Sequence, residues 1–464
     1  MLQNVMKNNG RPVCWKSAGA LVLFAAAALA AQAQTFTTLV TFSDKNGGGY
    51  KPNMSLVQGY NGFLYGTTPQ GGTAQNGTVF AMSLAGKLKT LATFNGTDGE
   101  DAYYGLALFK GIFYGTTSDG GANGYGTLFS MTPQGALTTL YNFSGTEGAP
   151  NGALLSANGM LYGVTCCGGA NGWGTVFSAS TSGAVTPIYS FTDGNDGGGP
   201  WGGLVQDGDG LFYGTTATGG AYGLGTVFSV TASGTLTTLY AFSGPDGSNP
   251  LAALLLGPDG NFYGTTDYGG ANNQGTVFQI TPMGSLTTLY SFSGPDGATP
   301  CAPLILGTDG NFYGTTYQGG SDGDGTIFQL TSNGVLTSLF SFTYPDGVYP
   351  SGALYQATDG NFYGATGQGG SVTQSRGTLF RLSMGLAPFV ETTTSSGRVG
   401  TAVAILGTDL TGASSVTFNG TSATFTVVSA TEIRATVPAG ATSGTIQVVT
   451  PDGTLSSNAP FQVN

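Results

Sequence analysis

The most constraining feature of this sequence is a Tyr-Gly motif, followed by Thr, Val or Ala and then Thr, that recurs at a nearly constant interval. Successive copies lie 48 to 51 residues apart. The seven copies begin at Tyr65, Tyr114, Tyr162, Tyr213, Tyr263, Tyr313 and Tyr363. Self-similarity at a fixed period of this length is the signature of repeat architectures such as solenoids and propellers. Most of the chain therefore consists of seven repeats of about fifty residues.

Each repeat contains four short runs with the composition of β-strands. In the fifth repeat these are the Tyr-Gly run, residues 275–278 (Gly-Thr-Val-Phe), residues 286–292 and, after a Gly-rich loop, the apolar run at residues 302–306. Asp-Gly or Pro-x-Gly pairs separate the runs, which is typical of strands joined by tight hairpins. The sequence thus predicts an all-β fold with a seven-bladed β-propeller over residues 34–386. A parallel β-solenoid is the alternative, although its coils are shorter and need no hairpin turn.

The two ends of the repeat array complement each other. Residues 35–42 form a strand-like run that stands alone before the first repeat, whereas the last repeat stops at residues 377–383 without its own fourth strand. We therefore expect the N-terminal strand to complete the last blade, which removes an exposed sheet edge. Within each blade, the expected order from the centre outward is the apolar run, the Tyr-Gly run, the Gly-Thr run and the Leu-Thr-Thr-Leu run.

From residue 387 to residue 464 the fifty-residue period is absent. Short alternating runs replace it at residues 399–401, 416–420, 433–438 and 446–449. This pattern suits a small β-sandwich. We therefore predict a second domain over residues 387–464.

These motifs carry two resemblances. The stretch from residues 261–266 (Asn-Phe-Tyr-Gly-Thr-Thr) to residues 286–290 resembles the GloVer repeat of choice-of-anchor tandem repeat proteins. The C-terminal part, with Pro388 and residues 397–401 and 437–440, resembles an IPT/TIG immunoglobulin-like domain. Both resemblances imply an exported, often surface-associated protein. The family name refers to varied C-terminal anchors, yet the last residues form neither an apolar tail nor a basic cluster, so we expect the sandwich itself to attach the protein.

The first 33 residues have the layout of a secretory signal peptide. Lys7, Arg11 and Lys16 precede an apolar run at residues 18–30, and residues 31–33 (Ala-Gln-Ala) form a cleavage-site pattern. An uncleaved membrane anchor is the alternative, although the run is short for a bilayer span. We expect a protein that is secreted or held at the extracellular surface, with the periplasm as the other compartment, and no membrane span after signal cleavage.

The chain is acidic, with 12 Lys and Arg residues against 23 Asp and Glu residues and a formal net charge of −11 at pH 7. Removal of the leader takes away three basic residues and no acidic ones. A surface of this sign repels phosphate backbones and anionic lipids. Nucleic acid is therefore not an expected partner, and a glycan or protein at the cell surface is.

The sequence excludes several kinds of catalysis. No histidine is present, which removes Ser-His-Asp, Cys-His and His-metal chemistry. Outside the leader, Cys166, Cys167 and Cys301 form neither a disulfide framework nor a zinc pattern. The adjacent Cys166 and Cys167 are either free thiols or a strained vicinal disulfide. No phosphate-binding Gly-x-x-x-x-Gly-Lys segment occurs.

Most carboxylates lie at Asp-Gly turns, where the side chain caps its own backbone. Residues 207–210 and 322–325, both Asp-Gly-Asp-Gly, resemble calcium loops but lack the distant Glu that completes such a site. We therefore expect no catalytic residue, no metal ligand and no cofactor, with calcium as the alternative.

The repeated tyrosines stand beside the Phe of Gly-Thr-x-Phe in every repeat, which favours packing between blades over a binding role. Function is therefore expected where the repeats differ, in the loop after Tyr-Gly-Thr-Thr and the loop before the apolar run. The expected strand order places both loops on one variable face. Aromatic side chains there suit stacking on a sugar or contact with a peptide, although each could instead cover a loop base. The candidate ligand-binding residues are Tyr103, Tyr104, Tyr125, Trp173, Trp201, Tyr222, Tyr268, Tyr317, Tyr344 and Tyr349.

Three hypotheses follow, in order of preference. The first is a secreted or cell-surface binding module whose variable face contacts a glycan or a protein. The second is a carbohydrate-active enzyme, which needs two carboxyl groups about 5 to 9.5 Å apart across one pocket. Its candidate carboxylates are Glu100, Asp101, Asp119, Asp193 and Asp267. The third is a structural surface protein without a discrete ligand.

Overall fold

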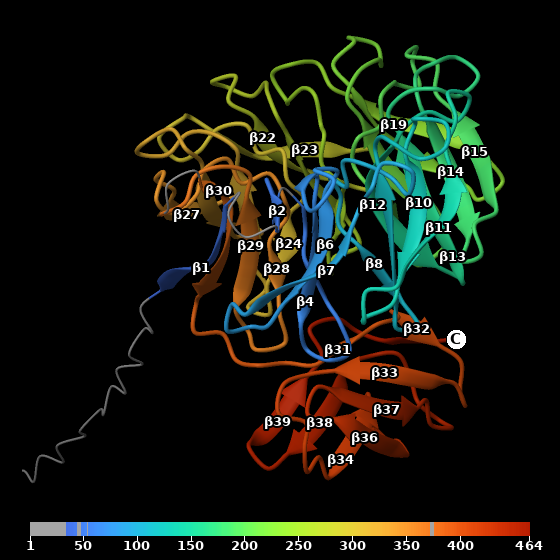
Figure 1. Cartoon of the computed structure of the whole chain (residues 1–464), viewed down its shortest axis with the longest axis vertical. Helices are drawn as coiled ribbons and strands as arrows, with labels where there is room; N and C mark the ends of the chain where they lie inside the picture. The colour runs from blue at the N-terminus through green and yellow to red at the C-terminus, as the bar shows by residue number, and fades with distance from the viewer. Residues whose placement is uncertain (1–33, 44–47, 53, 372–374) are drawn as a thin grey trace, which may run out of the picture. The chain divides into compact units, whose positions relative to one another are not determined.

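The computed structural model of the chain describes residues 34–43, 48–52, 54–371 and 375–464 (Figure 1). Every regular element within these ranges is a β-strand, so the prediction of an all-β chain is confirmed. None of the described segments is a helix with the length and apolar character needed to cross a membrane. The predicted signal peptide, residues 1–33, lies outside the described residues.

Counted from the apolar run that precedes its Tyr-Gly motif, each of the seven repeats folds into a four-stranded antiparallel sheet, and the strands follow the predicted order. The first three sheets are β3 (Val57–Gln58), β4 (Leu64–Thr68), β6 (Thr78–Met82) and β7 (Leu88–Thr93); β8 (Ala107–Phe109), β9 (Ile112–Thr117), β10 (Thr127–Met131) and β11 (Leu137–Asn142); and β12 (Pro150–Ala157), β13 (Met160–Thr165), β14 (Thr175–Ser180) and β15 (Val185–Ser190).

The next three sheets are β16 (Val205–Gln206), β17 (Phe212–Thr216), β18 (Thr226–Val230) and β19 (Leu236–Ala241); β20 (Leu255–Leu256), β21 (Phe262–Thr266), β22 (Thr276–Ile280) and β23 (Leu286–Ser291); and β24 (Ile305–Leu306), β25 (Phe312–Thr316), β26 (Thr326–Leu330) and β27 (Leu336–Ser341). The seventh sheet combines β28 (Tyr355–Gln356), β29 (Phe362–Thr366) and β30 (Ser375–Ser383) with β1 (Thr35–Ser43). A small two-stranded sheet joins β2 (Gly49–Tyr50) to β5 (Gln70–Gly71).

The glycine of the Tyr-Gly motif is required by the phenylalanine of Gly-Thr-x-Phe. In the fourth repeat Gly214 on β17 pairs with Phe228 on β18, and a Cβ on Gly214 would lie 2.7 Å from the Phe228 ring. The same crowding occurs in all seven repeats, at 2.4 to 2.7 Å. Phe228 is fully buried, so a larger residue at the glycine would force the ring out of a close-packed core.

The threonines and the tyrosine of the motif also have fixed partners. The hydroxyl groups of Thr216 and Thr226 are hydrogen-bonded at 2.8 Å, and an equivalent buried pair occurs in every repeat. The Tyr213 ring contacts Phe262 of the next repeat, with ring centroids 4.1 Å apart, and four other motif tyrosines make the same contact. The predicted packing role of the tyrosines is therefore seen in the structure.

The first and last repeats are in contact. Strand β1, which precedes the first repeat, pairs antiparallel with β30 of the seventh, as predicted (Figure 1). Phe36 on β1 also stacks on Phe340 of the sixth repeat, with ring centroids 3.8 Å apart. The Ala353 N–H donates to Ser55 Oγ at 3.2 Å. A single buried cluster contains side chains from both repeats, including Leu56 and Phe80 from the first and Tyr363 and Leu379 from the seventh. The first repeat is therefore the neighbour of the seventh.

The innermost strand is shorter than the sequence predicts in every sheet except the third, where β12 extends over Pro150–Ala157. In the sixth repeat only Ile305 and Leu306 form strand β24, whereas the apolar run begins at Ala302. The Ala302 carbonyl instead accepts a hydrogen bond from the Thr265 hydroxyl of the preceding repeat, at 3.3 Å. The residues before the strand therefore contact the neighbouring repeat.

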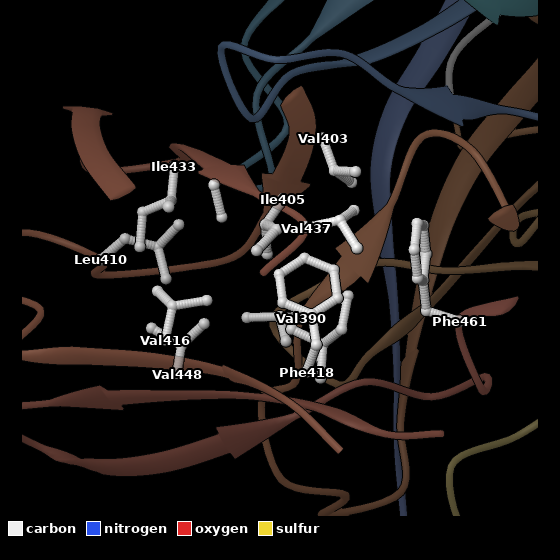
Figure 2. Packing of buried hydrophobic residues seen from close by; sticks show 12 residues of the cluster. Val390, Val403, Ile405, Leu410, Val416, Phe418, Ile433, Val437, Val448 and Phe461 are labelled. Atoms are coloured by element: carbon white, nitrogen blue, oxygen red, sulfur yellow. The ribbon is translucent and has the colours of Figure 1, made fainter. Parts of the chain in front are cut away.

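The C-terminal residues form two further four-stranded sheets that share a core (Figure 2). Val403 and Ile433 from one sheet and Val416 and Phe418 from the other are all buried in it. The sheets are β31 (Glu391–Thr392), β33 (Ala402–Leu406), β37 (Glu432–Thr436) and β36 (Phe425–Ser429), and β35 (Thr421–Ser422), β34 (Ser415–Phe418), β38 (Ile446–Thr450) and β39 (Gly453–Ser456). A parallel pair joins β32 (Ser396–Gly397) to β40 (Gln462–Val463).

One predicted C-terminal strand is wrong. Residues 399–401 (Val-Gly-Thr) form a turn, and strand β33 begins only at Ala402. Gly400 has φ +85°, a conformation suited to a turn, and its N–H donates to the Val437 carbonyl at 2.9 Å. The alternation of Val and Thr is typical of a strand, but the backbone conformation of the glycine produces a turn.

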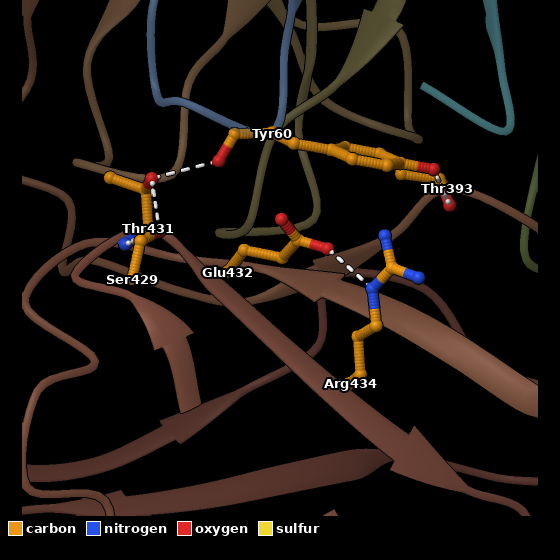
Figure 3. Close-up of polar contacts among 6 residues, drawn as sticks. All are labelled: Tyr60, Thr393, Ser429, Thr431, Glu432 and Arg434. Carbon is orange, nitrogen blue, oxygen red and sulfur yellow. Dashed lines mark hydrogen bonds and ion pairs between the residues drawn. The ribbon is translucent and has the colours of Figure 1, made fainter. Parts of the chain in front are cut away.

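The C-terminal sheets contact the short turns that join the inner two strands of the first and seventh repeats. The Thr431 hydroxyl donates to the Tyr60 carbonyl at 2.8 Å, and the Tyr60 hydroxyl lies 3.4 Å from Thr393 Oγ1 (Figure 3). In the turn of the seventh repeat Thr358 Oγ1 lies 3.0 Å from Thr408 Oγ1. The hydroxyl of Tyr355, on the adjoining strand β28, donates to Glu391 Oε1 at 2.6 Å. These contacts leave the opposite loops, those that differ among the repeats, away from this interface.

Candidate functional site

A cavity of about 490 Å³ is lined by residues from all seven repeats. In each repeat the lining residues belong to the three positions that precede a leucine at the start of the innermost strand. The leucines are Leu56, Leu106, Leu154, Leu204, Leu254, Leu304 and Leu354. The lining residues are 54–55, 103–105, 152–153, 201–203, 251–253, 301, 303 and 351–353. One cavity therefore collects equivalent positions of every repeat.

A residue with a left-handed backbone conformation precedes the cavity-lining segment in most repeats. Five positions before the leucine, φ lies between 55° and 61° in six repeats. These residues are Lys51, Asp101, Gly199, Asn249, Thr299 and Tyr349. Thr299 is held by two hydrogen bonds, from its N–H to the Gln274 carbonyl at 2.9 Å and from the Tyr317 N–H to its carbonyl at 3.0 Å. A β-branched residue adopts this conformation only where the surrounding structure enforces it. The turn before the cavity-lining residues therefore has a fixed conformation.

The residue three positions before the leucine differs in every repeat that the structure describes there. In chain order it is Tyr103, Asn151, Trp201, Leu251, Cys301 and Ser351. The two positions that follow are mostly Gly or Ala, so they leave the cavity open. At Gly203 this small size is obligatory, because a Cβ there would lie 2.6 Å from the Ala153 carbonyl oxygen. Close contact between neighbouring backbones thus forms the wall, and in five repeats the variable side chain lines it.

Three of the ten predicted binding residues line this cavity: Tyr103, Tyr104 and Trp201. Trp201 is 43% exposed, so its ring stands at the opening. The Tyr104 hydroxyl donates to Asn151 Oδ1 at 2.7 Å, and burial of the ring raises the pKa of Tyr104. The rings of Tyr103 and Tyr104 are in edge contact, with centroids 6.5 Å apart. The cavity therefore has an aromatic side built from the second and fourth repeats.

The other seven predicted residues do not line the cavity. Five of them are exposed on the outer loops: Tyr125, Trp173, Tyr222, Tyr268 and Tyr344. Tyr317 and Tyr349 stack on each other, with ring centroids 5.0 Å apart, and so are occupied by mutual packing. The structure therefore brings together three members of the predicted set and separates the rest.

The candidate carboxylates do not meet across the cavity, because none of the five lines it. The backbones of Glu100 and Asp119 pair, and the pKa of Asp101 beside them is raised to about 6, mainly by burial and then by these two carboxylates. Asp193 accepts a hydrogen bond from the Thr218 hydroxyl at 2.7 Å. Among the described residues no three Asp, Glu, Cys or His side chains are grouped closely enough to hold a metal ion.

Asp267 lies behind the cavity wall. The Asp267 carbonyl and the Pro300 ring both lie within 3 Å of where a Cβ on Gly275 would stand, which places Asp267 beside the residue preceding Cys301. The Asp267 side chain is 5% exposed, and its Oδ1 accepts no hydrogen bond from the described residues. Burial raises the pKa of this carboxyl to about 7. Burial, and then the charge of Asp267, raises the pKa of the Cys301 thiol to about 12.

The adjacent cysteines lie close to the aromatic side of the cavity. Their Sγ atoms are 3.6 Å apart, well beyond a disulfide bond length, so Cys166 and Cys167 are free thiols here. Hydrogen bonding from Cys166 lowers the pKa of the Cys167 thiol to about 6. Neither sulfur belongs to the cavity lining.

Several lining residues escaped the sequence prediction, including Met54, Leu251, Cys301 and Ser351. They are not aromatic, so a search for exposed rings passes over them. Alignment of the seven repeats on their leucine finds Leu251, Cys301 and Ser351, because they occupy the third position before it, which varies more than any neighbouring position of the wall. Met54 occupies the second position. The sequence signal for the other three lining residues is a change of residue type from repeat to repeat at one fixed position relative to the leucine.

Comparison with known proteins gives one family and several distant structural likenesses. The family model of the Gloeobacter/Verrucomicrobia repeat matches residues 22–155, 146–305 and 207–428 in three overlapping segments. No curated protein matches the chain significantly.

Similar solved structures include a fungal alcohol oxidase of the AA5 family in complex with copper, at 14% identity and a TM-score of 0.49, over 90% of this chain and all of that one. The extracellular domain of a one-component system from B. thetaiotaomicron is 10% identical with a TM-score of 0.46, over 73% of this chain and 39% of that one. A protein described as a 6-phosphogluconolactonase from Bacteroides uniformis is 17% identical with a TM-score of 0.44, over 61% of this chain and 83% of that one. At such low similarity, none of these likenesses bears on activity.

Proposed function

Because this chain belongs to the Gloeobacter/Verrucomicrobia repeat family, we propose that its repeats build a scaffold for a secreted or cell-surface binding module. The ligand, a glycan or a protein, contacts the variable face around the opening of the cavity. A single observation carries the proposal: one cavity receives residues from the same three-residue segment of all seven repeats, and the first residue of this segment differs in each of the six repeats in which the structure describes it.

The architecture that accompanies this function is a seven-bladed β-propeller over residues 34–386. It is supported by the pairing of β1 with β30, by the contacts between the first and seventh repeats, and by the shared cavity. Residues 387–464 are an IPT/TIG-like β-sandwich, supported by two sheets around one core. Residues 1–33 direct export, so the module acts outside the cell or in the periplasm.

An apolar cavity of this volume lies within the range of 300 to 1,000 Å³ that is usual for ligand sites. Variation on an otherwise repeated framework is what a recognition surface requires, because the framework fixes the position of each side chain while the side chains set the specificity. The same cavity holds no pair of carboxylates, so the geometry favours binding over glycoside hydrolysis.

A binding screen of the full chain against glycan arrays, cell-wall fractions and surface-protein extracts tests this function. We expect retention on at least one fraction, and loss of that retention in Trp201→Ala. Tyr222→Ala is the matched control, because it removes a more exposed aromatic side chain from an outer loop of the same repeat. Retention that is lost in Tyr222→Ala and kept in Trp201→Ala contradicts the proposal, and an empty screen favours a structural surface protein.

A further inference from the structure

From the chemistry of the cavity wall, and resting on the proposed binding function, we infer that the cavity takes a neutral aromatic group of two or three rings, either a free molecule or a side group of a larger ligand. Aromatic side chains stand on one side of it, and no charged side chain lines it among the described residues. Burial of a charge without a partner is costly, so the wall selects against ions.

The positions of the rings argue for a flat ligand. Tyr103 and Tyr104 come from the second repeat and Trp201 from the fourth, whereas the third repeat between them contributes only Gly152 and Ala153. A Cβ on Gly152 would lie 2.9 Å from the Trp201 carbonyl oxygen, so the third repeat meets the fourth as bare backbone. Rings on both sides of an unobstructed stretch of wall provide faces for offset or edge contact with an aromatic ligand.

The polar groups of the wall are too few for a sugar. The Tyr104 hydroxyl is already bonded to Asn151, and Ser55 Oγ already accepts from the Ala353 N–H. The hydroxyls of Ser55, Tyr103 and Ser351 and the indole N–H of Trp201 remain as lining side-chain donors, because Ser55 Oγ uses only a lone pair toward Ala353. A buried hexose would leave several of its hydroxyls without partners, at a cost for each, whereas an aromatic group needs few.

The volume sets the size of the group. An apolar cavity of about 150 Å³ is enough for benzene. The present cavity, at about 490 Å³, therefore accommodates a bicyclic or tricyclic ring system. The acidic character of the chain adds a further bias against anions, because its formal net charge is −11.

Two dyes with one skeleton test the inference on the full chain. N-phenyl-1-naphthylamine is neutral and has three rings, and 1-anilinonaphthalene-8-sulfonate carries the same rings with a negative charge. We expect saturable fluorescence enhancement with the neutral dye and an affinity for it at least about tenfold above that for the sulfonate. Equal or tighter binding of the sulfonate overturns the inference.

Two substitutions locate the dye. Trp201→Ala should weaken binding of the neutral dye at least about tenfold, and Leu251→Trp, which fills part of the cavity with a new ring, should weaken it as well. Tyr222→Ala should leave the affinity unchanged. Unchanged binding in both cavity variants overturns the inference. If the dye fails to bind while Trp201→Ala still abolishes retention in the glycan and cell-wall screen, the binding function stands and only the ligand class is wrong.

Discussion

The Tyr-Gly strands and the residues just before each leucine differ in a way that separates structure from function. The strands show the same packing arrangement in all seven repeats: a glycine lies under a phenylalanine ring, two buried threonines are hydrogen-bonded, and a tyrosine packs against the next repeat. The residues before the leucine repeat only their backbone and change their side chains. Where all repeats share the same side chains, those side chains pack the core. Where the repeats share only the backbone conformation, the differing side chains form the candidate site.

The largest expected effect comes from the strand that joins the two ends of the array. Deletion of residues 34–42 removes the partner of β30, the partly buried ring of Phe36 and the buried ring of Phe42, and exposes a sheet edge. Loss of two such rings alone costs roughly 3 to 6 kcal/mol of the free energy of unfolding. Urea unfolding followed by circular dichroism should show this loss, with Phe36→Ala giving only part of it. If the deletion costs no more than Phe36→Ala, the strand does not close the array.

The scaffold itself should respond strongly to a single substitution. Phe228→Ala leaves a cavity beneath Gly214 in a fully buried core and should lower the free energy of unfolding by about 3 to 5 kcal/mol. Leu251→Ala, on the cavity wall, serves as the comparison and should cost much less, because Leu251 already faces an open space. Similar losses in the two variants would erase the distinction between scaffold and site. Denaturant titration measures both.

The buried Asp267 should make stability depend on pH. Its pKa in the folded state is about 7 against an ordinary 3.8, so the folded state holds the proton more tightly. The contribution of Asp267 to stability is therefore largest below about pH 4, falls as the pH rises from about 4 to about 7, and changes little above that. Asp267→Asn removes this loss and should be more stable than the original chain at pH 8, by at most about 4 kcal/mol.

The difference between the two chains should vanish near pH 4, where both side chains are neutral. Asp322→Asn, at an exposed loop position, keeps Asp267 and should therefore show the same pH dependence as the original chain. Free energies of unfolding at pH 4, 6 and 8 make the comparison. A variant that is less stable at every pH would show that Asp267 has a partner as an anion.

The smallest expected effect on stability is at the site. Trp201→Ala removes a side chain that is 43% exposed and should change the free energy of unfolding by less than about 1 kcal/mol. Its effect on binding should be large. A loss of several kcal/mol in thermal or urea unfolding would place Trp201 with the scaffold.

The architecture of the repeats was predictable because each of its determinants is local. The strand order, the packing of Tyr213 and the displaced strand β1 follow from motifs that recur in register. The turn at Gly400 was missed because a short Val-Gly-Thr run has the composition of a strand. The length of the inner strands was overestimated because residues such as Ala302 are hydrogen-bonded to a neighbouring repeat. No local sequence pattern indicates that partner.

The candidate site was only partly predictable. The sequence placed the variable loops on one face, but it could not tell which aromatic side chains turn inward. That choice depends on the left-handed turn before the wall, as at Thr299, and on contacts between residues about fifty positions apart. Tyr222 and Trp201 have similar chemistry, yet only Trp201 follows that turn into the cavity. Whether an aromatic residue lines the cavity is therefore set by its position relative to the leucine and not by its residue type.

An exchange of residues between repeats tests this account most directly. Trp201→Leu gives the fourth repeat the wall residue of the fifth, and Tyr222→Asn gives it the equivalent outer-loop residue of the fifth. With the ligand found in the binding screen, or with N-phenyl-1-naphthylamine, the dissociation constant of each variant is measured. We predict that Trp201→Leu weakens binding at least about tenfold while Tyr222→Asn leaves it within about twofold. Weaker binding in Tyr222→Asn with unchanged binding in Trp201→Leu would contradict a site built from the cavity wall.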